Sequence, residues 1–379
     1  MNILQLAFHT SPFNEVGKND GGGMSIYVQQ ISRHLSGNHN VTVVTGEKAE
    51  GFKENNLEFI SLNIFESNLN VEDKEVYLQE FKNKLEESLD LKSFDVIHAH
   101  YWLSGLIAKE ISNEFDIPFV FTSHSLGVFL DGYNKERVDC EKIVMTSSNI
   151  VTASSEFENM LIADTYNVNE NKIKKITPGV DKEIFSPNPS VKKENIFLSI
   201  GRIQEQKGQL QTLEFLNNFR KIKNDFKCIF IGGPSGKYGE EYLLELKRTV
   251  KDFNLEKHVE FLDNLPQTKI IELLNKSKLL IHTSQFETFG LVAIEANTMG
   301  VPVLTINNGS LMEIIENNKN GYLSENLIDK DVNNFVSNLL NEDKKFEEVS
   351  LTCIEKSKKY DWENTSQMLQ NIYKELVTY

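Results

Sequence analysis

Glu287 and Glu295 are the first residues whose type and spacing could do chemistry. They lie eight positions apart in the stretch 284–300, SQFETFGLVAIEANTMG. Apolar residues surround Glu295, and a carboxylate in such a place is costly unless hydrogen-bond donors meet it. Sugar hydroxyl groups are donors of this kind. Taken alone, two glutamates at this spacing are more often a surface residue and an exposed or salt-bridged one, because short patterns recur by chance.

A basic pair, Arg202 and Lys207, lies in the string GRIQEQKG between an expected strand and an expected helix. Arginine offers a planar fork of donors and lysine a compact charge, and both suit a diphosphate. Alone, the pair is more simply explained as two solvated side chains. Its place after a strand favours a ligand site, because the loop should lie at the same sheet edge as Glu287.

The elements around Glu287 form a strand–loop–helix–strand unit. An apolar strand is expected over 278–283, a short helix over 291–299 with Gly300 as its stop, and another strand over 302–306. Such a unit belongs to a parallel sheet, whose carboxyl edge is where ligands bind. The backbone N–H groups of Phe289, Gly290 and Leu291 would open the helix, where an anion is favoured.

Length and composition exclude several classes of protein. A chain of 379 residues suffices for two domains, and 40% hydrophobic with 25% charged residues is ordinary for a globular protein. No window resembles a membrane span or a signal peptide. Three isolated cysteines suggest neither a disulfide framework nor a metal site, so we expect a cytoplasmic protein. The net charge of −15 argues against nucleic acid as a partner and leaves a homodimer open.

Strands and helices alternate along both halves of the chain, which predicts parallel sheets covered on both faces. Residues 186–194 concentrate Pro, Ser and charge and mark a linker. We therefore expect an N-terminal domain over 1–185, rejoined by a C-terminal helix over 362–379, and a second domain over 186–361. The first-half strands are expected at 2–8, 41–45, 56–62, 95–99, 118–123, 150–153 and 173–177, and its helices at 24–35, 71–89, 103–111, 140–147 and 156–166. The second-half strands are expected at 195–200, 226–232, 259–262, 278–283 and 302–306, and its helices at 209–222, 240–253, 268–276, 291–299, 331–340 and 363–377.

The longer strings resemble a known family. EtFGLVAIEAntmGvPVL is similar to the E-x7-E signature of retaining, nucleotide-sugar-dependent glycosyltransferases of family 4. Within it, GGGMSIYVQQISRHLS, HAHYWLSG, GRIQEQKG and GGPSG look most like the branch that contains the mycothiol glycosyltransferase and sucrose-phosphate synthase. The resemblance covers essentially the whole chain. It implies the α/β GT-B fold, in which two Rossmann-like domains face each other across a cleft.

The resemblance also implies a reaction. A hydroxyl of the acceptor attacks the anomeric carbon of a nucleotide sugar, by default a UDP-sugar, with retention of configuration and with no enzymic nucleophile. Arg202 and Lys207 would hold the diphosphate, Glu287 the sugar hydroxyls and Glu295 the ribose. Gly22 and Gly23 in the first glycine-rich loop would also touch the nucleotide sugar, and His124 would orient and stabilise the donor sugar. We expect a hexosyltransferase that needs no cofactor and no divalent metal.

Four further residues resemble the phosphate-holding set of the mycothiol branch: Lys74, Tyr101, Ser125 and Arg137. An arginine, a lysine and two hydroxyls make a suitable cage for a dianion. The resemblance thus implies a small phosphorylated polyol or sugar as acceptor, such as an inositol phosphate or a hexose phosphate. Each residue also has an ordinary explanation, such as a solvated lysine or an arginine paired with Glu141 on a helix.

Alternatives remain open at this point. Asp329 and Asp331 form the single D-x-D, which precedes a helix that Asp331 could cap, and we interpret it as structural. His98 and His100 point to one face of a strand, but no third ligand is evident, so a hydrogen-bonded role is favoured over a metal. A phosphorylase of the same fold, a glycosyltransferase of polysaccharide or glycolipid synthesis, and a non-catalytic sugar-binding protein are the other functions to weigh.

Overall fold

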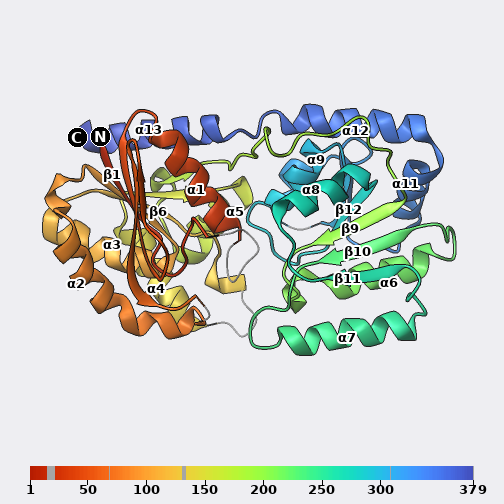
Figure 1. Cartoon of the computed structure of the whole chain (residues 1–379), viewed down its shortest axis with the longest axis horizontal. Coiled ribbons are helices and arrows are strands. Elements are labelled where there is room, and N and C mark those ends of the chain that lie inside the picture. Colours follow the sequence, from red (N-terminus) through yellow and green to blue (C-terminus); the bar gives the residue numbers. More distant parts are fainter. Residues whose placement is uncertain (15–21, 68, 130–133, 308, 379) are drawn as a thin grey trace. The chain divides into compact units, whose positions relative to one another are not determined.

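The structure is a computed structural model that describes residues 1–14, 22–67, 69–129, 134–307 and 309–378 (Figure 1). The chain divides into two compact units. Unit 1 comprises Met1–Gly179 with Trp362–Tyr379, and unit 2 comprises Val180–Asp361. The predicted boundary between 185 and 186 falls inside unit 2 by this division. The reason is that Val180 and Phe185 are buried in a hydrophobic cluster of unit 2.

Unit 1 is built on an eight-stranded sheet in the order β3-β4-β2-β1-β5-β6-β7-β8. Neighbouring strands are parallel except for the β3–β4 hairpin. The strands are β1 (Asn2–Leu6), β2 (Asn40–Glu47), β3 (Phe52–Glu54), β4 (Leu57–Phe65), β5 (Val96–His100), β6 (Phe119–Thr122), β7 (Ile150–Ala153) and β8 (Ile173–Lys175).

Helices cross between these strands, as parallel connections require. They are α1 (Gly23–Leu35), α2 (Leu78–Ser88), α3 (Trp102–Phe115), α4 (Lys135–Ser147) and α5 (Glu156–Tyr166), with 3-10 turns η1 (Glu72–Tyr77), η2 (Leu91–Ser93), η3 (Gly127–Phe129) and η4 (Glu170–Lys172). The C-terminal helix α13 (Trp362–Thr378) also belongs to unit 1. It packs against α1, and the Tyr373 hydroxyl lies 2.6 Å from His98 Nδ1.

Unit 2 holds a six-stranded sheet in the order β11-β10-β9-β12-β13-β14, in which every neighbouring pair is parallel. Its strands are β9 (Ile196–Ile200), β10 (Lys227–Ile231), β11 (Val259–Leu262), β12 (Leu279–His282), β13 (Val303–Ile306) and β14 (Gly321–Ser324). Its helices are α6 (Gln209–Phe219), α7 (Gly239–Asp252), α8 (Gln267–Lys276), α9 (Leu291–Thr298), α10 (Leu311–Ile314), α11 (Lys330–Asn341) and α12 (Asp343–Ser357), with a 3-10 turn η5 (Glu205–Lys207).

The apolar runs of the unit 2 strands are explained by burial on both faces. Side chains alternate between the faces of a strand. In β12, Leu279 and Ile281 join one hydrophobic cluster, whereas Leu280 joins the other. A strand covered on both sides must be apolar throughout, which is the pattern expected for parallel sheets.

The structure answers two questions about function, on membrane-spanning helices and on the D-x-D motif. Within the residues that the structure describes, no helix combines the length and the apolar character needed to cross a membrane. The D-x-D motif opens α11, where the Asp329 side chain accepts a 3.4 Å hydrogen bond from the Asp331 N–H. Asp329, and not Asp331 as predicted, is therefore the capping residue.

Candidate functional site

In unit 2 the predicted Lys207 and Glu287 lie together. Lys207 ends η5 after β9, Glu287 follows β12, and these two strands are neighbours in the sheet. Lys207 Nζ lies 3.3 Å from Glu287 Oε2 and 3.4 Å from Ser284 Oγ. Both side chains of the pair are largely covered, with 25% and 17% of their surface exposed.

Backbone contacts hold the two loops in register. The Gln285 N–H donates to Gln206 O at 2.8 Å, and the Thr283 hydroxyl donates to Gly208 O at 2.8 Å. Gly208 has φ +67, and a Cβ there would lie 2.1 Å from Thr283 O. Position 208 therefore needs glycine both for its left-handed conformation and for the close approach of the loop carrying Glu287.

Sequence reasoning missed His282, the last residue of β12. His282 is buried, and its Nε2 lies 3.2 Å from the same Glu287 oxygen that Lys207 approaches. Burial alone would raise the pKa of Glu287, but the Lys207 charge and the hydrogen bond from His282 outweigh it and hold that pKa below its ordinary value. Glu287 is thus a carboxylate fixed in place and kept ionised. The signal in the sequence was a histidine at the end of an apolar strand.

Glu295 contrasts with Glu287. It lies half-buried on α9, and in the described part of the chain no hydrogen bond reaches its carboxylate. Burial raises its pKa to about 7. A half-buried acid with no hydrogen-bond partner among the described residues is the kind of polar group that was expected to need a hydroxyl-bearing ligand.

The other residues of unit 2 that were predicted to bind the nucleotide sugar lie after β9 and at the start of α9. Arg202 is exposed two residues beyond the end of β9, and no partner for its guanidinium is found among the described residues. Gly290, with φ +92, precedes α9. Phe289 is buried in the hydrophobic cluster that also contains Ala293 and Ile294 of α9. The first N–H groups of α9 have no partners within the helix, as at any helix start. Arg202, Lys207 and this helix start therefore provide positive charge and N–H donors at the carboxyl edge of the sheet.

The predicted acceptor residues of unit 1 also gather at one place. Arg137 Nη2 donates to Ser125 Oγ at 3.0 Å, and the guanidinium carbon lies 4.8 Å from the centroid of the Tyr101 ring. That ring stands against His9, with centroids 4.3 Å apart. Lys74 Nζ donates to His9 O at 2.8 Å. The structure thus brings all four predicted residues around His9, which the sequence analysis did not select.

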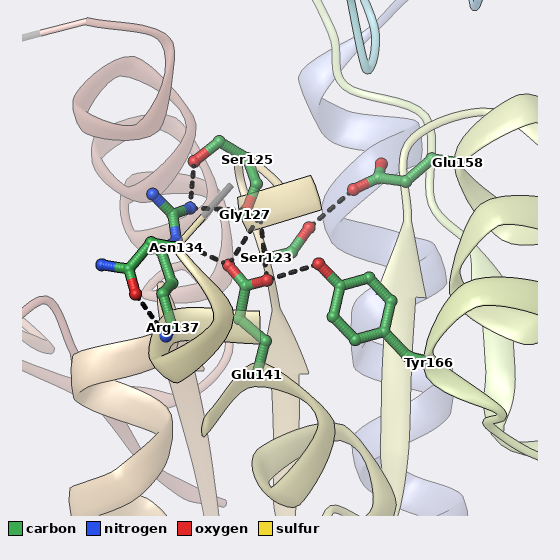
Figure 2. A network of polar contacts seen from close by, with 8 residues as sticks. All are labelled: Ser123, Ser125, Gly127, Asn134, Arg137, Glu141, Glu158 and Tyr166. Atoms are coloured by element: carbon green, nitrogen blue, oxygen red, sulfur yellow. Dashed lines mark hydrogen bonds and ion pairs between the residues drawn. The ribbon is translucent and has the colours of Figure 1, made fainter. Parts of the chain in front are cut away.

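Glu141 fixes the orientation of Arg137 (Figure 2). One carboxylate oxygen accepts from Arg137 Nε at 2.8 Å, and the carboxylate also accepts from the Gly127 N–H and the Tyr166 hydroxyl. Arg137 and Glu141 have 6% and 1% of their side-chain surface exposed. The expected surface pair of α4 is therefore a buried one. It ties the arginine to the loop that carries Ser125.

His9 is a buried histidine with no charge at neutral pH. Its pKa lies well below the ordinary value because of burial first, and then because of the nearby charges of Lys74 and Arg137. Its Nδ1 atom is buried without a partner among the described residues. A neutral ring beside two cations keeps the local charge positive, which is suited to an anion.

His124 follows β6 in a backbone conformation that non-glycine residues rarely adopt, with φ +59. Its Nε2 lies 3.0 Å from His100 Nδ1. His98 makes its own bonds, to the Tyr373 hydroxyl and to Thr122 Oγ1 at 2.8 Å. Among the described residues no group of three or more His, Cys, Asp or Glu side chains could hold a metal ion.

Gly22 and Gly23 open α1 and are exposed, with Gly22 as the residue before the helix. Gly21, the first glycine of the run, lies outside the described residues. The turn 233–236 lies beside the Arg202 loop, because Ile203 and Pro234 form a bridge and the Ser235 N–H donates to Ile203 O at 3.2 Å. The strand-end loops of unit 2 therefore support one another.

Comparison with known proteins gives the family and the fold of the chain. Residues 21–184 match the family described as Glycosyltransferase Family 4, and residues 180–360 match the family described as Glycosyl transferases group 1. The chain is similar to the D-inositol 3-phosphate glycosyltransferase of Corynebacterium diphtheriae, with 25% identity covering 98% of this chain and 94% of the relative. The enzyme of the same name from Frankia alni is 29% identical, covering 83% and 85% of the two chains.

Solved structures confirm the predicted fold. Sucrose-phosphate synthase from Thermosynechococcus elongatus superposes with a TM-score of 0.87 at 21% identity, covering 100% of this chain and 99% of the other. Anabaena Alr3699/HepE, solved in complex with UDP and glucose, gives 0.79 at 19% identity, covering 98% and 99%. The predicted α/β architecture of two Rossmann-like domains is thus correct. The chain is a glycosyltransferase of the GT-B fold and belongs to family 4.

Proposed function

We propose that this glycosyltransferase moves a hexose from a UDP-sugar to a small phosphorylated polyol or sugar, with retention of configuration and without a metal ion. The observation that carries the proposal is the clustering of Lys74, Tyr101, Ser125 and Arg137 in unit 1. It places two cations and two hydroxyls at the carboxyl edge of the sheet in a chain with a net charge of −15.

The local charge explains why the acceptor should be an anion. Arg137 is held through Nε by Glu141 and through Nη2 by Ser125, which leaves Nη1 with no bond among the described residues. Lys74 is fully buried, so in this conformation its charge acts on an anion through the field and not by contact. A guanidinium edge beside the Ser125 hydroxyl and over the Tyr101 ring suits the oxygens of a phosphate.

The relatives support the same substrate class. Their name, D-inositol 3-phosphate glycosyltransferase, describes a phosphorylated polyol as acceptor, and they align over nearly the full length of this chain. An inositol phosphate or a hexose phosphate is therefore the acceptor to test. Uridine as the base is supported by the Anabaena structure solved with UDP-glucose.

On the donor side, each unit 2 residue has a role in the proposal. Arg202, Lys207 and the N–H groups at 289–291 would stabilise the negative charge that develops on the departing diphosphate, as preorganised donors do. These two cations would supply what a divalent metal supplies elsewhere, so the proposed reaction needs no metal. Glu287 would hold hydroxyls of the donor sugar, and the unpaired Glu295 would accept from the ribose.

The reaction would then proceed on one face of the sugar. The acceptor hydroxyl attacks the anomeric carbon from the side on which the diphosphate leaves, and a diphosphate oxygen takes the acceptor's proton. The new glycosidic bond forms as the bond to the diphosphate breaks. His124 would orient the donor sugar, and it takes no part as a nucleophile.

A panel of nucleotide sugars, each with an inositol phosphate or a hexose phosphate, tests the proposal. We expect UDP release with one donor in the presence of EDTA, and a product whose anomeric configuration, read by NMR, matches that of the donor. Transfer that requires an added metal, or a product of inverted configuration, would contradict the mechanism. Release of inorganic phosphate from a sugar phosphate would instead indicate a phosphorylase.

A further inference from the structure

Three side chains at the ends of neighbouring strands of unit 1 form a chain of hydrogen bonds. Gln5 lies on β1, His100 ends β5 and His124 follows β6, and these strands are adjacent in the order β1-β5-β6. Gln5 Oε1 lies 3.1 Å from His100 Nε2, and His100 Nδ1 lies 3.0 Å from His124 Nε2. Gln5 and His100 are completely buried.

Neither ring carries a charge. Burial, followed by the neighbouring histidines, holds the pKa of His100 well below its ordinary value, and burial lowers the pKa of His124 to about 3. A neutral imidazole has one N–H donor and one acceptor nitrogen. Fixing either nitrogen by a hydrogen bond therefore fixes the other.

The direction of the chain follows from its first member. An amide oxygen only accepts, so His100 Nε2 must carry the hydrogen that points to Gln5 Oε1. His100 Nδ1 is then a lone pair, and His124 Nε2 must donate to it. His124 Nδ1 is left as an acceptor. No hydrogen bond to it is found in the part of the chain that the structure describes.

The position of His124 indicates what could meet this acceptor. It has a left-handed backbone and immediately precedes Ser125 in the chain. Arg137 contacts Ser125 (Figure 2). We propose that Gln5, through His100, fixes the tautomer of His124 so that Nδ1 accepts a hydrogen bond from a hydroxyl of the bound substrate. Gln5 and His100 are then positioning residues. The substrate contact rests on the proposed function, whereas the tautomer does not.

The chain offers a matched control in His98. It lies two residues before His100 on the same strand, and the two ring centroids are 4.1 Å apart with the ring planes tilted by 37°. Both residues are completely buried. The ring nitrogens of His98 bond to Tyr373 and Thr122 and not to His124. Replacing His98 therefore disturbs the same buried strand but leaves the bond to His124 in place.

The test begins with NMR of the wild-type protein labelled with ¹⁵N-histidine, which has only eight histidines. The His124 signal is identified by its loss in His124→Asn. We expect a neutral ring with hydrogen on Nε2. A ring with hydrogen on Nδ1 would overturn the proposal. It is the outcome if the Gln5 amide is rotated, because its buried Nε2 group has no partner among the described residues and would then donate to His100.

Kinetics then test the role of the tautomer. His100→Leu should lower kcat/KM with the nucleotide sugar by about tenfold, the scale of one lost neutral hydrogen bond. It should also mix the two tautomers of His124. His100→Asn, which restores an acceptor near the Nδ1 position, should recover most of the loss. His98→Leu should lower Tm by about as much as His100→Leu does, but it should leave the His124 tautomer unchanged.

Each outcome has one meaning. Equal kinetic losses in His98→Leu and His100→Leu would show a merely structural effect and overturn the role of His100. A wild-type protein that consumes no nucleotide sugar would refute the proposed function while the NMR result on the tautomer still stood. If His100→Leu does not fold, the wild-type spectrum still decides whether Nδ1 of His124 is the acceptor.

Discussion

Glu295 should make the binding of the nucleotide sugar depend on pH. Its half-buried carboxylate has a pKa of about 7, raised by burial. Ribose hydroxyls donate hydrogen bonds, and the ionised carboxylate accepts them best, so the ionised form is the one that binds. Affinity for a UDP-sugar should therefore rise with pH through neutrality.

The magnitude follows from the fraction ionised. With a pKa of about 7, that fraction changes about tenfold between pH 6 and pH 8, and the dissociation constant should fall by about the same factor. The intact nucleotide sugar is the ligand to use, because free UDP has a terminal phosphate that itself titrates near pH 6. Isothermal titration calorimetry at several pH values gives the constant directly.

Two variants make this test decisive. Glu295→Gln should bind with little dependence on pH, while Glu347→Gln, on the exposed side of α12, should keep the wild-type slope. A slope that persists in Glu295→Gln, or its absence in the wild type, would refute the ribose role. The free energy of unfolding should fall as pH rises, whereas the affinity for the UDP-sugar increases, because the pKa of Glu295 is raised in the folded state. The contribution of Glu295 to stability is full below its ordinary pKa of about 4.5 and is lost as pH rises through about 7.

Three other predictions concern the donor site and its loops. Lys207→Ala and Arg202→Ala should each lower turnover at least ~10²-fold, as loss of a preorganised donor does; Arg202→Ala, at an exposed position, should change Tm little, and near-normal turnover in both variants would exclude the diphosphate role. Gly208→Ala should destabilise the protein by roughly 2–5 kcal/mol, because the new Cβ meets Thr283 O at 2.1 Å in a left-handed conformation; an unchanged melting temperature would show that the loops are not packed as described. Incubation with EDTA should leave the rate of transfer unchanged, and a loss restored by Mg²⁺ or Mn²⁺ would disprove metal independence.

Most of the fold could be predicted from the sequence because both sheets are parallel apart from the β3–β4 hairpin. Strands buried on both faces are continuous apolar runs, and helices fill the gaps between them, so the alternation is visible. The elements that the sequence analysis missed do not show this alternation clearly. The β3–β4 hairpin strand Phe52–Glu54 is short and polar, β14 has four residues, and α12 carries many charges on its exposed side.

The residues of the candidate site also include some that the sequence could identify and some that it could not. Glu287 and Lys207 could be selected because they stand in distinctive strings after strands, and the structure places them 3.3 Å apart. His9, His282 and Gln5 could not. Gln5 lies within an apolar strand, His282 ends one, and His9 follows one by three residues. A single polar residue in such a place is usually structural. The importance of each of these residues depends on which strands are neighbours in the sheet. The order of strands in a sheet is a long-range property that periodicity does not reveal.

The choice between phosphorylated and unphosphorylated acceptors tests the central claim most directly. Steady-state transfer should be measured with inositol and hexose phosphates and with the same molecules lacking the phosphate, in the wild type and in Arg137→Ala. We expect the wild type to prefer one phosphorylated acceptor by at least ~10²-fold in kcat/KM, on the scale of a charge-assisted pair of hydrogen bonds. Arg137→Ala should raise KM for that acceptor strongly and leave the affinity for the UDP-sugar unchanged. Equal use of the unphosphorylated molecule, or a silent Arg137→Ala, would contradict the account and favour an acceptor from polysaccharide or glycolipid synthesis.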